Sequence, residues 1–338
     1  MIMSAMSQIF YYLGHEQFQP EVLVKHAELA EKAGFDGIFI SEHFNPWVAD
    51  KGAAGFAFST LGAIAATTVK IKLMTGVVTP LFRYHPAVVA QAAATIDRLS
   101  NGRFMLGVGN GEAINEVALG YDFPKYAERS ERMQEAIEIM KKLFNGEKVD
   151  YDGKYYKTKS AKLYSPPIHQ IPILLAAGGP KSVALAREYA DGLIVSVKDP
   201  NESLQTINPK EEKVVDPKRS RRIRDKPFIV TTSRWTVFAQ NEDEAWQSLL
   251  AWRGLRAPSR NTAVDPEQLQ KEADTLPRGD ILSRYTIVSS AQQYIDAYKP
   301  LIADLKADIV AIQTTGIDQE KIIELLGNEV VPELKKIS

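Results

Sequence analysis

Candidate catalytic side chains in this chain are gathered in five short segments that combine polar residues with glycines. Four of the segments directly follow an apolar run, and a helix-like stretch comes after each. His43 is the strongest candidate, because an imidazole titrates near ~6.5 and can accept and return a proton at neutral pH. Glu16 and Glu112 stand in two other segments and are further candidates for proton transfer. Ordinary structural or surface roles are the competing interpretation; the segments are 14–16, 41–47, 76–80, 107–112 and 176–180.

Two of these segments contain enough glycine to admit a ligand close to the backbone. Residues 107–111 read Gly-Val-Gly-Asn-Gly and end at Glu112, where a dinucleotide-binding fingerprint would need another glycine. Residues 177–180 read Ala-Gly-Gly-Pro and lead into a predicted helix, whose first N–H groups would favour a phosphate. A simple tight turn explains the second segment equally well.

Composition excludes several other kinds of chemistry. The chain has 338 residues and no cysteine, which rules out disulfides, thiolate metal sites and cysteine nucleophiles. A net charge of −1 argues against a nucleic-acid partner. Neither the spacing of a metal site nor a Gly-x-Ser-x-Gly nucleophile motif is present, and no apolar run approaches the ~18 residues that would span a membrane. We therefore expect a soluble, cytoplasmic protein whose residues 1–7 are disordered or a remnant of cloning.

The elements that must position these residues alternate between apolar strands and amphipathic helices. Residues 37–40 are apolar throughout, as is typical of a parallel strand buried on both faces. We predict a single α/β domain over residues 8–338, a (β/α)8 TIM barrel, in which all the strand ends meet on one face that holds the active site. The expected strands are 9–13, 37–40, 69–78, 103–108, 173–176, 192–197, 228–238 and 308–314. The expected helices are 20–33, 56–67, 86–99, 126–144, 181–189, 243–253, 291–305 and 319–337.

Three stretches interrupt this alternation. Residues 147–171 are expected to be an insertion, with a small hairpin over 149–156 that turns at Asp152-Gly153. Residues 258–281 are expected to be a second, irregular insertion. The stretch 202–226 should supply a helix, yet Pro209 and Pro217 interrupt it. Its basic run over 218–226 is interpreted as a solvated surface, with steering of a polyanion as the alternative.

Taken together, the strand-end motifs resemble those of the luciferase-like flavin and deazaflavin oxidoreductases. The likeness is greatest to the coenzyme F420-dependent glucose-6-phosphate dehydrogenases, and it extends over essentially the whole chain. It is carried by Glu16-Gln17-Phe18, Glu42-His43-Phe44-x-Pro46-Trp47, Thr79-Pro80-x-Phe82-Arg83-Tyr84, the run from Gly107 to Glu116, and Ala176-Ala177-Gly178-Gly179-Pro180.

The resemblance implies a deazaflavin in the barrel mouth and a distinct role for each catalytic residue. His43 would take the proton from the C1 hydroxyl of a sugar while a hydride passes to the cofactor. Glu112 would stabilise or protonate the reduced ring, Trp47 would pack on the reacting centre, and Glu16 would bond the sugar or His43. Whether Glu16 or Glu112 donates the proton stays open at this point.

The resemblance also implies a set of cofactor contacts. The family often has a non-proline cis peptide after the third strand, which corresponds to Gly76-Val77 here. Glu42 would stand where the family has an aspartate that contacts the cofactor, a difference of one methylene. The full set of expected contacts is Glu42, Gly76, Val77, Thr79, Gly109, Asn115, Gly178 and Gly179.

Cations decide between a sugar phosphate and a plain alcohol. By resemblance, Lys198, Arg260 and Arg284 would hold the phosphate, with Arg256 competing for the place of Arg260; surface cations are the alternative. The resulting expectation is an F420-dependent sugar-6-phosphate dehydrogenase, and by resemblance a homodimer. Its rivals are an F420-dependent alcohol or hydroxy-lipid dehydrogenase, an FMN-dependent luciferase-like monooxygenase, and a flavin- or deazaflavin-binding protein without catalysis.

Overall fold

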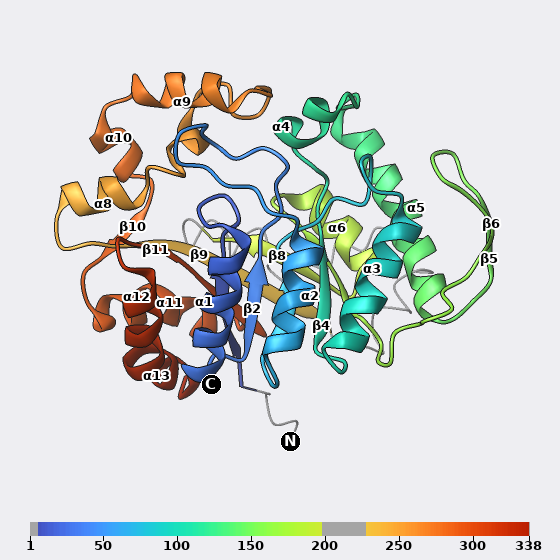
Figure 1. Ribbon diagram of the computed structural model, residues 1–338, viewed down its shortest axis with the longest axis horizontal. Helices are drawn as coiled ribbons and strands as arrows, with labels where there is room; N and C mark the ends of the chain where they lie inside the picture. Colours follow the sequence, from blue (N-terminus) through green and yellow to red (C-terminus); the bar gives the residue numbers. More distant parts are fainter. Residues whose placement is uncertain (1–5, 198–227, 338) are drawn as a thin grey trace.

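Eight parallel strands close into a barrel in the computed structural model, which describes residues 6–197 and 228–337 (Figure 1). Neighbouring strands pair in the order β9-β11-β1-β2-β3-β4-β7-β8, and β8 pairs in turn with β9. The predicted TIM barrel is thereby confirmed. The strands are β1 (Gln8–Leu13), β2 (Gly37–Ile40), β3 (Lys72–Thr75), β4 (Phe104–Val108), β7 (Ile173–Ala176), β8 (Gly192–Ser196), β9 (Ile229–Phe238) and β11 (Ile309–Thr315).

Successive side chains of each strand point alternately into the barrel and toward the helices. In β1, Phe10 belongs to the cluster that fills the barrel, while Ile9 and Tyr11 pack in the larger cluster between strands and helices. Both clusters are apolar, which is why the strand segments of the sequence are apolar throughout. The cluster inside the barrel consists of Phe10, Phe39, Met74, Met105, Leu174, Ile194, Ile309 and Ala311.

The helices that cover the barrel begin and end close to their predicted residues. Proline stands in the first turn of four of them. The expected helix 319–337 is interrupted by a π-helical turn at Leu326–Val330, where Gly327 lies so close to Ala33 that a side chain would not fit. The helices are α1 (Pro20–Lys32), α2 (Ala57–Thr67), α3 (Pro86–Leu99), α5 (Tyr126–Phe144), α6 (Pro180–Tyr189), α11 (Ala291–Ala303), α12 (Gln319–Leu325) and α13 (Val331–Lys335).

The third strand is much shorter than the predicted 69–78. Before it, the Glu31 carboxylate accepts hydrogen bonds from the backbone N–H groups of Val69, Lys70 and Ile71, at 2.9, 2.6 and 2.8 Å. After it, the Gly76–Val77 peptide is cis, as expected from the resemblance. Because the N–H groups of residues 69–71 donate to a side chain of α1, these residues cannot join the hydrogen-bond ladder of β3.

The second expected insertion is helical rather than irregular. It contains α9 (Pro266–Asp274) and α10 (Arg278–Leu282), and α9 starts at Asp265, whose side chain accepts a hydrogen bond from the Glu267 N–H. An aspartate followed by proline is an ordinary helix start, so the sequence contains a signal for α9 that the prediction of an irregular insertion did not use. Nearby are α8 (Glu242–Ser248), a 3-10 turn at Arg253–Arg256 and the short strand β10 (Thr286–Val288), which pairs with β9.

The added elements lie at two places around the barrel (Figure 1). α9, α10 and the short helix α4 (Ala113–Glu116) lie at one end of it, and the hairpin of β5 (Val149–Asp152) and β6 (Lys157–Ala161) projects at the side, next to α5. Within the described residues, no helix combines the length and the apolar character needed to cross a bilayer. The expected disordered start falls mostly on residues 1–5, and the stretch 202–226 falls entirely on 198–227; both lie outside the described residues.

Candidate active site

A cavity of about 360 Å³ opens at the carboxyl ends of the barrel strands. It is bounded by residues that lie in or after seven of the eight strands, because parallel strands end on the same face of a barrel. The structure thus brings together most of the residues singled out from the sequence. Those that line it are Glu16, Glu42, His43, Trp47, Gly76, Val77, Thr79, Gly109, Glu112 and Asn115.

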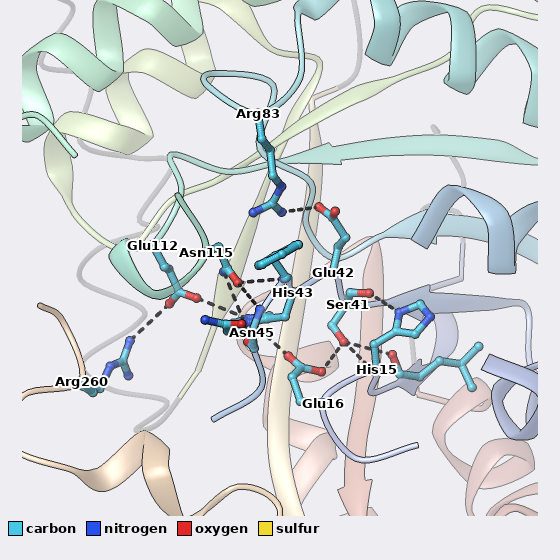
Figure 2. A network of polar contacts seen from close by, with 12 residues as sticks. His15, Glu16, Ser41, Glu42, His43, Asn45, Arg83, Glu112, Asn115 and Arg260 are labelled. Carbon is cyan, nitrogen blue, oxygen red and sulfur yellow. Dashed lines mark hydrogen bonds and ion pairs between the residues drawn. The ribbon is translucent and has the colours of Figure 1, made fainter. Parts of the chain in front are cut away.

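His43 projects into this cavity from the end of β2, with its two ring nitrogens in different surroundings (Figure 2). Nε2 lies 3.3 Å from Glu112 Oε2 and 3.5 Å from Glu16 Oε1, and Nδ1 lies 3.1 Å from the Asn45 carbonyl oxygen. The Asn45 carbonyl and the two carboxylates are hydrogen-bond acceptors, so each ring nitrogen has an acceptor beside it that can stabilise a proton on the imidazole. The Trp47 ring, 4.9 Å from the imidazole, shields it from solvent.

Asn115 on α4 orients the loop that carries this histidine. Its Oδ1 accepts hydrogen bonds from the Phe44 and Asn45 N–H groups, at 2.9 and 3.3 Å. Its Nδ2 lies 3.3 Å from His43 Nδ1. The sequence interpretation gave Asn115 a cofactor contact alone, and its grip on the His43 loop was missed because it joins segments about 70 residues apart.

Buried polar residues hold the Glu16 carboxylate in place through hydrogen bonds. The Ser41 hydroxyl donates a very short hydrogen bond to its Oε2, and the same hydroxyl accepts the His15 N–H at 3.0 Å. The His15 ring contacts the Ser41 carbonyl at 2.7 Å and the Thr60 hydroxyl at 2.9 Å. Burial lowers the pKa of His15, which keeps its ring neutral. His15 is therefore a structural tie rather than a second base.

Glu42 is held by two residues that have no role in the sequence interpretation. Arg83 Nη2 donates to its Oε2 at 2.8 Å, and the Tyr84 hydroxyl donates to its Oε1 at 2.5 Å. Arg83 Nη1 also donates to Glu116 at 3.1 Å, so one guanidinium serves two buried carboxylates. Burial raises the pKa of Glu116 to about 7, against the opposing effect of Arg83. Both Arg83 and Glu116 lie in the motifs that carry the resemblance, which was the available signal.

One cation, Arg260, reaches the cavity through contacts with Glu112 and Trp47 of its lining. Arg260 Nη2 lies 3.6 Å from Glu112 Oε1, and its guanidinium lies 5.6 Å from the centre of the Trp47 ring. Arg256 donates to the Tyr285 hydroxyl at 3.2 Å and to the Arg284 carbonyl at 3.4 Å. Burial raises the pKa of Tyr285, and the positive charge of Arg256, whose guanidinium lies 4.4 Å from the centre of the Tyr285 ring, acts to lower it. Lys198 lies outside the described residues.

A second cavity, of about 580 Å³, adjoins the first at the start of α6. Asn110 and Ala176 line both cavities, and Gly178, Gly179 and Tyr126 line the second. A side-chain carbon at either glycine would meet none of the described residues within 4 Å. Asn110 Oδ1 and the Tyr126 hydroxyl are buried, and neither has a hydrogen-bond partner in the part of the chain that the structure describes. Unpaired polar atoms beside a helix N-terminus fit the phosphate-bearing chain of a cofactor whose ring would lie in the first cavity.

Known proteins with similar sequences include a family of oxidoreductases. The sequence profile of the luciferase-like monooxygenase family matches residues 1–306. The F420-dependent glucose-6-phosphate dehydrogenase of Microbacterium testaceum is 36% identical to this chain, over 96% of the chain and 97% of the relative. The protein of the same name from Nocardia farcinica is 35% identical, over 96% of each.

Among solved structures, an F420-dependent secondary alcohol dehydrogenase in complex with an F420-acetone adduct is similar, with a TM-score of 0.87. Its sequence is 28% identical, and the match covers 98% of this chain and 99% of the other. The family match spans far more than half of the sequence, and the relatives match over nearly their full length. The chain therefore belongs to the luciferase-like monooxygenase family.

Proposed function

We propose that this protein is an F420-dependent sugar-6-phosphate dehydrogenase, with glucose 6-phosphate as the substrate. The observation that carries the proposal is the position of His43 Nε2 between two carboxylates, in a cavity with Arg260 at its rim. A base next to a cation-lined rim suits an alcohol that carries a phosphate at its other end. The names of the relatives from Microbacterium and Nocardia support the same reaction.

His43 acts as the general base in this proposal. Its Nε2 takes the proton of the C1 hydroxyl, and the Asn45 carbonyl, which accepts from Nδ1–H, stabilises the imidazolium that forms. The chemistry that F420 supplies when bound is acceptance of the hydride from C1, which leaves the lactone as product. Trp47 keeps water away from the ring of the base.

The two carboxylates beside His43 differ in how freely they can move a proton. Glu16 is buried and its second oxygen is occupied by Ser41, so it serves to fix and stabilise the charged imidazole. Glu112 has a side chain 39% exposed and reaches both the cavity and solvent. We therefore assign the proton donor role to Glu112 rather than to Glu16.

The cofactor would be held by residues of both cavities. Gly76, Val77, Thr79 and Gly109 line the first, where the ring would lie. Gly178 and Gly179 at the start of α6 would offer N–H groups to its phosphate. Glu42, fixed by Arg83 and Tyr84, would present a carboxylate of set orientation to the ring.

The second candidate is an F420-dependent alcohol dehydrogenase, which the similar solved structure favours. The test is the loss of oxidised F420 absorbance on mixing the protein with F420 and glucose 6-phosphate, glucose or isopropanol. Bleaching by the sugar phosphate alone is expected. Bleaching by isopropanol alone would replace the proposal with the alcohol dehydrogenase, and oxygen consumption with FMN would replace both.

The phosphate site has its own test. Lys198→Ala and Arg284→Ala are each expected to raise KM for glucose 6-phosphate at least tenfold while leaving F420 affinity unchanged, because a charge-assisted contact to phosphate is lost. Unchanged KM in both variants would disprove the site. The cytoplasmic location and the homodimer stay predictions, and sedimentation of the purified protein checks the second.

A further inference from the structure

We propose that Arg260 couples phosphate recognition to proton abstraction, by releasing Glu112 to His43 when a phosphate dianion binds. This inference rests on the proposed function and deepens it. Three side chains stand in a row in Figure 2: Arg260 Nη2 is 3.6 Å from Glu112 Oε1, and Glu112 Oε2 is 3.3 Å from His43 Nε2. One carboxylate is thus shared between a rim cation and the base.

The contact between Arg260 and Glu112 is loose enough to be exchanged. Its 3.6 Å separation exceeds the ~2.7–2.9 Å of a well-formed charge-assisted hydrogen bond. The two side chains are 34% and 39% exposed, and Arg260 Nε is buried without a hydrogen-bond partner among residues 6–197 and 228–337. Arg253, on the same side of the barrel, shows the contrasting arrangement: it is 4% exposed and bound to Asp274 at 2.6 Å and to Asp50 at 3.0 Å.

A phosphate dianion at this rim would compete with Glu112 for the guanidinium. The dianion carries about twice the charge of a carboxylate and can bond an arginine at two points. Arg256, which packs on the Tyr285 ring and donates to the Arg284 carbonyl, brings a further positive charge within four residues of Arg260. Among the described residues neither Arg256 nor Arg284 forms an ion pair that would have to be broken first.

Release of Glu112 would strengthen the base. While Arg260 neutralises part of the Glu112 charge, the carboxylate supports a proton on His43 Nε2 less well. Once the dianion holds Arg260, that charge acts on Nε2 alone. The other titratable groups around His43 are Glu16, Glu42, Tyr12, Glu116 and His15, and no contact joins any of them to Arg260 within the described part of the chain. A phosphorylated sugar would then gain in turnover as well as in binding.

The test follows the His43 ring by NMR, without cofactor, and uses sulfate as a probe that stays doubly charged across the pH range. Comparison with His43→Gln identifies its signal among the five histidines. In the unsubstituted protein, saturating sulfate is expected to raise the midpoint of this titration by on the order of one pH unit. Arg260→Gln should raise the midpoint without sulfate, and sulfate should add little.

Arg284→Gln is the matched control, because it removes another cation predicted to bind the phosphate, and within the described residues no ion pair joins Arg284 to Glu112. It should need more sulfate yet show nearly the full shift at saturation. The coupling would be disproved if sulfate shifted the His43 titration midpoint equally in the two variants, or if it caused no shift in the unsubstituted protein. The proposed function is judged separately: a normal shift without oxidation of glucose 6-phosphate would reject the dehydrogenase alone, and oxidation without a shift would reject the coupling alone.

Discussion

Nε2 is the ring nitrogen of His43 that would react, because Nδ1 contacts the Asn45 carbonyl and Nε2 faces two carboxylates in the cavity. His43→Gln keeps the size and polarity of the side chain and removes the base. Turnover is expected to fall about 10²–10⁴-fold, the usual contribution of a general base. F420 affinity, measured by fluorescence titration, should change less than twofold. Turnover that matched the unsubstituted protein would refute the base assignment.

Glu116 makes stability depend on pH. Burial raises its pKa in the folded protein from 4.5 to about 7, so between these values the folded state holds a proton that the unfolded state has lost. The free energy of unfolding is therefore highest, as far as Glu116 determines it, below pH ~4.5, and it falls as pH rises toward ~7. The shift of roughly 2.5 units corresponds to a loss on the order of 3 kcal/mol.

Glu116→Gln is expected to remove this pH dependence, because an amide has the shape of the carboxyl group and does not ionise. Urea unfolding should show similar stability for the two proteins at pH 4.5. At pH 8 the variant should be more stable by about 2–3 kcal/mol. The opposite sign at pH 8 would mean that Arg83 stabilises the ionised Glu116 by more than burial destabilises it.

Arg103 joins elements at the end of the barrel away from the site. Its guanidinium donates to the carbonyls of Ala65 and Thr68 at the end of α2, at 3.0 and 2.9 Å, and to that of Ile71 before β3 at 2.7 Å. Arg103→Met should lower the free energy of unfolding by about 2–4 kcal/mol, because several buried carbonyls lose their donor. At temperatures where the variant is folded, kcat and KM should not change.

Arg98→Met is the control for that variant. Arg98 makes a single hydrogen bond, to the Pro166 carbonyl at 3.0 Å, and is exposed on α3. Its substitution should change stability by less than ~0.5 kcal/mol. Equal losses in the two variants would show that Arg103 is not a connecting residue.

The molecule as a whole should report which cofactor it selects. A ligand bound only by the folded state stabilises it by about 2.7 kcal/mol at one hundred times its dissociation constant. For a chain of this length, that corresponds to a rise in Tm of roughly 4 °C. F420 should produce this rise in a thermal melt, and FMN at the same concentration should not. A rise with FMN alone would favour the monooxygenase.

Much of the architecture is determined locally along the sequence. β2 and α5 have the bounds expected from it, because an apolar run between polar turns and a 3.6-residue period are properties of consecutive residues. The rule that parallel strands end on one face then brings His43, Glu112 and Asn115 to one cavity. The family assignment confirms the resemblance that these motifs show, while the roles of single residues stay predictions.

The tertiary structure decided the features that depend on contacts between distant segments. Glu31 on α1 shortens β3 by accepting hydrogen bonds from the backbone before the strand. Gly327 contacts Ala33, although nearly the whole chain separates them in sequence. Arg83 joins Glu42 to Glu116, and Arg260 reaches Glu112 from a loop almost 150 residues later. Such contacts are set by packing in three dimensions, which no local pattern of residue types encodes. The sequence by itself therefore determined the barrel and the face that carries the site, and folding alone determined which charges meet there.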